Sequence, residues 1–205
     1  MATSNVSIAN LALQKLGASS IVALDSSPGK AADLNACFES IRDDELRKYL
    51  WKFAITRATL APHSTPPGSL VGYTYAMVLP SDFLRILKPA RLNLDWHLER
   101  HEGQLCLLTS DTNVLPIRYL ARITDPTAFD PCFVQMFACK LAWQCCERIT
   151  QSNTKRAAMM EEYQFHKADA RRTNAFEMPV QPQPVDEWLT GRSNGQLVNS
   201  EWDEE

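Results

Sequence analysis

The sequence predicts an α+β fold: a helical bundle with an inserted antiparallel β-meander domain and an extended C-terminal arm. Two changes of periodicity and one change of composition predict it. Apolar residues recur at helical spacing up to about residue 61, alternate as in strands from Val71 to Thr124, and then return to helical spacing. After Met178 the chain is polar and rich in Pro and Gly. The predicted domains are therefore a bundle in 1–66 and 125–178, a β domain in 67–124 and an acidic arm in 179–205.

Composition and charge limit the classes of function. The 205 residues are 45% hydrophobic and 22% charged, which is typical of a soluble globular protein. No apolar run is long enough to predict a membrane span and no signal segment is recognised at the start, so the protein is expected to act in the cytoplasm. The net charge is −3, and the residues after Met178 alone carry −5, which leaves +2 on the rest. A protein that grips nucleic acid is usually basic, whereas an acidic tail on a near-neutral body favours a protein partner.

The N-terminal half predicts two helices. In "SNVSIANLALQKLG", Ser4 or Asn5 can cap the first helix, and Gly17 stands where a helix-ending glycine belongs. Ser27 as N-cap and Pro28 at the first helical position open a second helix. This helix is expected to continue through "IRDDELRKYLWKFAITRATLA", Ile41–Ala61, where the apolar stripe rotates. A rotated stripe indicates a bend, or two faces that serve different neighbours.

Five short β-rich runs follow the breaker-rich loop "APHSTPPGS". Turn residues separate them, and Pro116 indicates an edge position for the last strand because proline lacks a backbone donor. The runs are "GYTYAMVL", "DFLRILKP", "LNLDWHLERH", "QLCLLTS" and "VLPIRYLARIT".

The C-terminal half predicts a helical hairpin. Asp130 as N-cap and Pro131 at the first position open an apolar helix, and "TQSN" separates it from a more polar helix. Three of the six cysteines recur every seven residues in the apolar helix, about 10.5 Å apart, so they cannot share one metal ion. They are Cys132, Cys139 and Cys146. We interpret them as a buried helical stripe of reduced thiols.

The carboxylates that could act as catalytic groups give little support for an active site. Asp43, Asp44 and Glu45 are consecutive, so on a helix they point about 100° apart and cannot converge on one bond. Arg42, Arg47 and Lys48 are spaced to neutralise them, which favours a solvated or inter-subunit salt-bridge face.

The remaining motifs do not predict a site either. "HLERH", His97–His101, has a zinc-like spacing, but the stretch alternates as a strand, where residues four apart are too distant for one ion. A hydrolytic triad stays possible, although no nucleophile elbow or phosphate loop frames one. We therefore predict no catalytic residue, cofactor or metal.

The tryptophans fall into two groups. Trp51, Trp96 and Trp143 lie in periodic elements and are expected in the core, while the polar arm carries others. Bulky apolar residues in such an arm are typical of anchors that bury themselves in a partner. The candidate anchors are Trp188, Leu189 and Trp202.

Five segments, in this order, resemble the tail tubular protein A family of short-tailed bacteriophages, the head-to-tail adaptors. The resemblance runs from about Val6 to Arg192, and the segments are "IANLALQKLGA", "RDDELRKYLWKFAITRATLA", "GYTYAMVLPSDFLRIL", "IRYLARITDPTAFDPCFVQMFACKLAWQCCERITQS" and "VDEWLTGR". One departure concerns the residue before Trp51, which is Leu50 here and usually proline in the family. Leucine is expected to let the helix continue, since proline would end it.

The resemblance implies a virion structural protein that is not an enzyme. Such adaptors are assembled in the host cytoplasm as a homo-oligomeric ring, typically a dodecamer, between the portal protein and the tail nozzle (tail tubular B) protein. Genomic DNA passes through the bore without specific binding, and no membrane is involved. The candidate assembly interface is then Asp43, Asp44, Arg47, Trp188, Leu189 and Trp202.

Two other functions remain open at this point. A tail-associated enzyme that degrades peptidoglycan is the first alternative, although the sequence offers no convergent carboxylate pair. A DNA-binding regulator is the second, and it predicts duplex binding that falls steeply with salt. The net charge of −3 speaks against the regulator.

Overall fold

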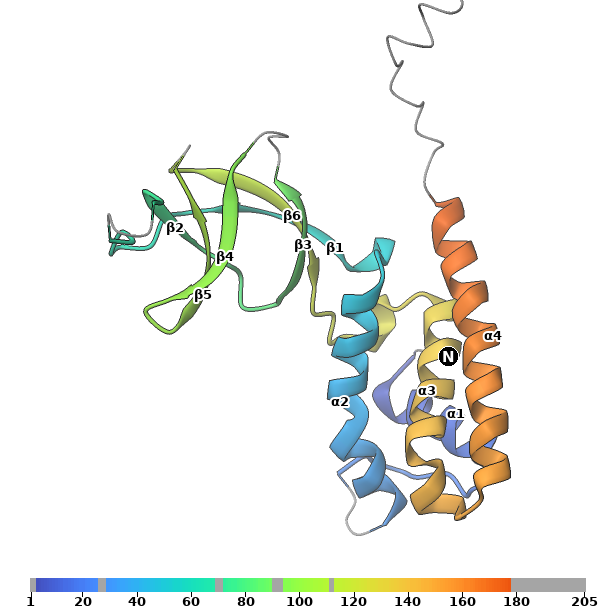
Figure 1. Cartoon of the computed structure of the whole chain (residues 1–205). Coiled ribbons are helices and arrows are strands. Elements are labelled where there is room, and N and C mark those ends of the chain that lie inside the picture. Colours follow the sequence, from blue (N-terminus) through green and yellow to red (C-terminus); the bar gives the residue numbers. More distant parts are fainter. Residues whose placement is uncertain (1–2, 26–28, 69–71, 90–93, 111–112, 178–205) are drawn as a thin grey trace, which may run out of the picture. The chain divides into compact units, whose positions relative to one another are not determined.

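The computed structural model describes residues 3–25, 29–68, 72–89, 94–110 and 113–177. These ranges form an α+β fold with four α-helices and two three-stranded antiparallel sheets. All the strands lie in sequence between two pairs of helices (Figure 1). The pairs are α1 (Asn5–Leu16) with α2 (Lys30–Lys48), and α3 (Pro131–Thr150) with α4 (Asn153–Phe176). In the described part of the chain, no helix combines the length and the apolar character needed to cross a membrane.

The predicted capping residues define the ends of α1 and the start of α3. The Ser4 hydroxyl accepts from the Ser7 amide in a capping box, and Gly17 ends α1 with a φ of 73°, a conformation that glycine adopts without strain. Asp130 accepts from the amides of Cys132 and Phe133, which satisfies two donors that the first turn of α3 leaves free. The predicted caps Ser27 and Pro28 lie outside the described residues, and α2 begins at Lys30.

The helices share a core centred on α3. Its apolar residues are buried against α1 and α2, and α4 adds Met159 and Tyr163. Aromatic rings pack edge to face in this core. The ring centroids of Phe38 and Phe137 are 5.0 Å apart, and those of Trp51 and Phe133 are 5.1 Å apart. The buried faces explain why these helices form, since each fully buried large side chain contributes about 1.5–3 kcal/mol.

Two groups of residues expected to lie in the core are buried to different degrees. Cys139 and Cys146 are buried and Cys132 is partly exposed. Trp51 is buried at 1% exposure, which confirms its predicted place, whereas Trp96 and Trp143 are partly buried. The predicted stripe of thiols therefore faces the core along most of α3.

The helix predicted for Ile41–Ala61 is wrong beyond Lys48. Tyr49 is extended, a short 3₁₀ turn, η1 (Lys52–Ala54), follows, and Ile55 starts a strand. The reason is tertiary: the Trp51 indole turns back to donate to the Glu45 carbonyl at 2.9 Å and enters the core. The side-chain amide of Asn174 in α4 fixes the exit, because it accepts from the Lys52 amide and donates to the Leu50 carbonyl. Leu50 therefore does not extend the helix.

The strands form two sheets with the orders β1-β6-β3 and β2-β5-β4. The five predicted strands are present, and β1 is the strand missed within the expected helix. Only β4 and β5 are neighbours in both sequence and sheet, so the arrangement is two small sheets and not the single meander expected. The bounds are β1 (Ile55–Leu60), β2 (Tyr75–Val78), β3 (Phe83–Pro89), β4 (Trp96–His101), β5 (Gln104–Thr109) and β6 (Leu115–Ala121).

The edge position predicted from Pro116 is wrong for the strand as a whole. Its strand β6 is central, between β1 and β3. Pro116 lies opposite Thr59 of β1, and among the described residues the pairing of β6 with β3 extends to Ile117. The proline therefore stands within a strand, but that strand is not at the edge of its sheet.

Candidate functional site

In the charged segment of α2, residues 42–48, several side chains form ion pairs or hydrogen bonds with other parts of the same subunit. Asp43 pairs with Arg42 and also with Arg122, which follows β6, at 2.7 Å. Arg47 donates from Nη1 to the Leu84 carbonyl in β3 at 3.0 Å. Two of the predicted interface residues, Asp43 and Arg47, therefore link α2 to the first sheet. Because their side chains serve the fold, they are weaker candidates for a subunit contact than the sequence indicated.

Asp44 is the exposed acid of this segment, whose bases Arg47 and Lys48 are exposed as well. Its side chain is 54% exposed, and its ion pair is with Lys48, one turn further along the same helix. An exposed pair of this kind contributes about 0.3–0.5 kcal/mol. Of the three α2 residues proposed for the interface, Asp44 is the one whose side chain is most available to a partner.

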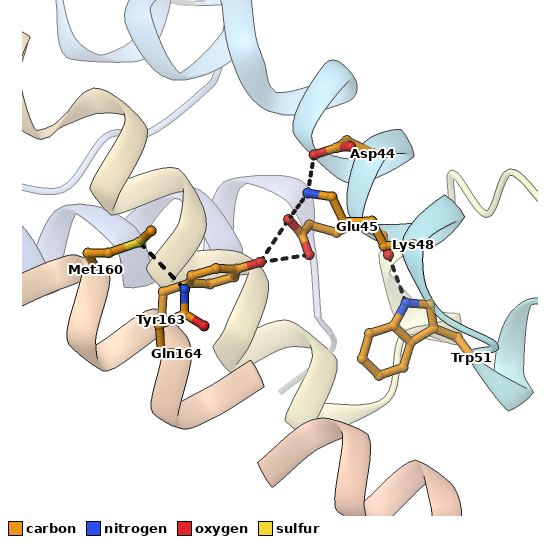
Figure 2. A network of polar contacts seen from close by, with 7 residues as sticks. All are labelled: Asp44, Glu45, Lys48, Trp51, Met160, Tyr163 and Gln164. Carbon is orange, nitrogen blue, oxygen red and sulfur yellow. Dashed lines mark hydrogen bonds and ion pairs between the residues drawn. The ribbon is translucent and has the colours of Figure 1, made fainter. Parts of the chain in front are cut away.

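Glu45 is fully buried and lies at the centre of a polar network (Figure 2). The Tyr163 hydroxyl of α4 lies 3.0 and 3.1 Å from the two Glu45 carboxylate oxygens, to which it donates. Lys48 forms an ion pair with the carboxylate at 3.0 Å and also reaches Asp44. A buried carboxylate needs such partners because burial without them costs several kcal/mol.

The ionisation of this network is fixed by its surroundings. Burial, and then the charge and hydrogen bond of Glu45, raise the pKa of Tyr163, so the phenol stays protonated and acts as a donor. Burial lowers the pKa of Lys48, but its bonds to Asp44 and Glu45 outweigh this, and the net pKa is raised. With both carboxylate oxygens occupied, the network joins α2 to α4 and offers no free base.

A second polar cluster joins α1, α3 and α4. The ligand atoms of Cys139, Glu162 and His166 lie within 4.8 Å of one another, a grouping that could suit a metal ion. The Lys15 ammonium, however, pairs with Glu162, and burial raises the pKa of the Cys139 thiol to about 11. The Glu162 carboxylate thus already has a cation as its partner, so we interpret the cluster as a structural ion pair.

Two surface hollows lack groups for acid–base catalysis. One, of about 580 Å³, lies along α1, and the other, of about 400 Å³, lies beside β2 and β3. Their linings are apolar, hydroxyl, amide or glycine residues without a carboxylate, imidazole, thiol or amine. Neither hollow therefore offers the pair of carboxyl groups that a peptidoglycan-degrading glycoside hydrolase would use. The linings are Ser7, Asn10, Leu11, Gln14, Gly17, Ala18 and Ser20, and Val78, Leu79, Pro80, Ser81, Phe83, Gln104 and Leu105.

"HLERH" forms strand β4, as the alternation predicted. Four strand residues span about 13 Å, so His97 and His101 cannot bind one ion in the way that a helical pair can. His101 instead has its Nε2 3.0 Å from the Thr65 carbonyl and its ring 5.2 Å from that of His63. These contacts tie the β4–β5 hairpin to the segment after β1.

The predicted arm anchors Trp188, Leu189 and Trp202 lie outside the described residues. Sequence reasoning missed a different outward aromatic residue, Phe165, which is 70% exposed on α4. The signal was available: α4 buries Met159, Tyr163 and Ala170, and Phe165 is out of phase with that stripe.

No protein-family model matches this chain, and none of the curated proteins matches its sequence.

Proposed function

We propose that the protein is a structural subunit of a ring, a head-to-tail adaptor that joins the portal to the tail nozzle of a short-tailed bacteriophage. In this proposal the α+β fold is a helical bundle with an inserted β domain and a C-terminal arm. The ring, a dodecamer by resemblance, lets DNA pass and resides at the head–tail junction of the virion.

One observation carries the proposal: the segments that resemble the adaptor family meet in one core. Four of the five segments lie within the described residues, and each contributes buried side chains to the core shared with the helices. If the resembling segments were separate stretches on the surface, they would support the proposal less, because surface stretches do not specify a fold. The members include Leu13, Leu46, Trp51, Leu84, Leu120 and Phe133.

The outer face of α4 is a candidate contact with a second subunit. We define it by exposed residues that recur at helical spacing: Ala158, Glu161, Phe165, Ala168 and Arg172. Phe165 forms its apolar centre, and one acid and one base flank it, a combination found at protein interfaces with an apolar centre and a polar rim. Closing a ring needs a different patch on the other side of the contact, and Asp44 is the candidate there.

Native mass spectrometry of the purified protein, alone and with a portal protein, tests the proposal. We expect a closed oligomer of the full-length chain, and a shift to monomer for Phe165→Ser. Val22→Ser is the matched control, since Val22 is 96% exposed but lies outside α4. A wild-type chain that stays monomeric with the portal protein would contradict the ring.

Charge reversal at Asp44 tests the second patch. Asp44→Lys should weaken assembly at low salt, because Asp44 is exposed and pairs only within α2 among the described residues. Reversing Asp43 as well would be less informative, since Asp43 pairs with Arg122 inside the subunit. Glu99→Lys, a charge reversal at an exposed acid on β4, outside both α2 and the outer face of α4, is the control. Normal assembly of Asp44→Lys would remove Asp44 from the interface.

A further inference from the structure

Two cysteines from different helices have their sulfur atoms in contact. Cys37 of α2 and Cys145 of α3 lie with their Sγ atoms 3.4 Å apart, although they are 108 residues apart in the sequence. Both are free thiols, Cys145 buried and Cys37 partly exposed. The other four cysteines contact different groups: Cys139 lies beside Lys15, Cys146 beside Thr150 and Cys132 beside Thr173, while Cys106 is buried in β5.

We propose that Cys37 and Cys145 form a redox modification site, in which hydrogen peroxide converts the two thiols into a disulfide that links α2 to α3. This inference is independent of the proposed function, since it rests on the thiol geometry alone.

The geometry favours bond formation within the folded protein. A disulfide has its sulfur atoms about 2.05 Å apart, so they must approach by about 1.4 Å. The two helices already pack against each other, and both thiols point at the same backbone carbonyl, that of Asp33. The Asp33 carboxylate in turn pairs with Arg148 of α3 at 2.9 Å, which holds this part of the two helices together.

The two thiols have unequal chemistry. The hydrogen bond from Cys145 lowers the pKa of Cys37, while that bond and burial raise the pKa of Cys145. Cys37, the more exposed thiol, is therefore the nucleophile, and Cys145 is the resolving thiol. Hydrogen peroxide is small enough to suit a partly buried sulfur.

The reaction balances in two steps. The Cys37 thiolate attacks one peroxide oxygen, the O–O bond breaks, and the departing hydroxide takes up a proton to form water, which leaves a sulfenic acid on Cys37. The Cys145 sulfur then loses its proton and attacks the Cys37 sulfur, and the S–O bond breaks with release of a second water. The thiols lose two electrons, and the peroxide gains them.

The disulfide would close a loop that contains all six described strands, since these lie between α2 and α3. A cross-link of that length restricts the unfolded chain much more than the folded one. The oxidised protein should therefore unfold at a higher temperature than the reduced protein, and a thiol reductant should reverse the difference.

Peptide mapping of the full-length protein after peroxide treatment, without reductant, tests the site. We expect a linked peptide that joins Cys37 to Cys145 with the loss of two hydrogen atoms. Cys37→Ser and Cys145→Ser should each abolish the linked peptide. Cys132→Ser, which changes a partly exposed thiol elsewhere on α3, should leave it in place.

The peptide map of the wild-type protein tests the proposed disulfide even if a variant folds poorly. Sulfinic acid on Cys37 without the linked peptide would overturn the proposal, and so would a cross-link that joins other cysteines or survives in Cys37→Ser. An unchanged thermal midpoint in fully linked protein would overturn the predicted constraint on the unfolded chain.

Discussion

Glu45 shows how a single residue can mislead when it is considered in the sequence alone. Beside Asp43 and Asp44 it appears to belong to a solvated acidic run, yet its side chain has 0% exposure. Its partner Tyr163 is 118 residues away, so no spacing in the sequence indicates the contact. The charge pattern predicted that α2 carries paired charges, but it could not distinguish the exposed Asp44 from the buried Glu45.

Removing the Tyr163 hydroxyl should therefore destabilise the fold. In Tyr163→Phe the ring still packs, but the Glu45 carboxylate loses a donor to both of its oxygens in the interior. We expect the free energy of unfolding, measured in urea, to fall by about 1–3 kcal/mol. Tyr73→Phe is the control, because Tyr73 makes no hydroxyl bond to any residue that the structure describes, and its change should be below about 0.5 kcal/mol.

The raised pKa of the Tyr119 phenol predicts that the protein loses stability at alkaline pH. Burial, and then its hydrogen bond to Asp82, raise the pKa of this phenol to about 12, from 10.0. Between these two pH values the folded state holds a proton that the unfolded state releases, so stability is complete below pH 10 and falls as the pH rises toward 12. Tyr119→Phe should have a shallower fall in unfolding free energy across that interval, although it starts lower because the bond to Asp82 is absent. Equal slopes for the two proteins would contradict this assignment.

At the scale of elements, helices α1, α3 and α4 and five strands follow from local signals. Ser4, Gly17, Asp130 and Pro131 mark helix ends in the sequence because capping is a local interaction. The exit from α2 was missed because "YLWKFAITRATL" keeps apolar residues at helical spacing. The strand there forms because Ile55–Leu60 pairs with β6, about sixty residues later, and tertiary pairing overrides local preference.

The end of α2 makes a proline at position 50 acceptable. Tyr49 has φ −127° and ψ 161°, the conformation that a residue before proline prefers. Leu50→Pro should therefore change the free energy of unfolding by less than about 1 kcal/mol, as measured in urea. Glu39→Pro, at an exposed position inside α2, should cost about 3 kcal/mol or more. A similar cost for both variants would show that the chain at position 50 needs its amide donor or another φ.

At the scale of the whole molecule, the sequence predicted the fold class but not the contacts between its parts. The changes of periodicity separate helical from strand-rich regions, and they are local. The junction of α2 with the first sheet depends on Asp43 with Arg122 and on Arg47 with Leu84, pairs that only the folded chain brings together. The same charges were therefore interpreted as an assembly surface.

Deleting the residues after Met178 should separate folding from assembly. Every buried core residue described lies between Ile8 and Ala170, so the truncated chain should keep its thermal unfolding midpoint within a few degrees. If Trp188, Leu189 and Trp202 anchor the subunit to a partner, the same truncation should block attachment to portal-bearing heads in a reconstitution assay. Attachment at normal yield would remove the arm from the interface, and failure to fold would show that the arm belongs to the core.

The pairing of β1 with β6 brings together the two points where the chain enters and leaves the strand-rich region. Ile55 lies opposite Leu120, and Leu120 is buried in the helical core while Ile55 packs against it. The helical core also takes Leu84 from β3, but none of its described members comes from β2, β4 or β5. Evolution can therefore vary the length and sequence of the second sheet, and with them what that sheet contacts, while the helical scaffold stays unaltered.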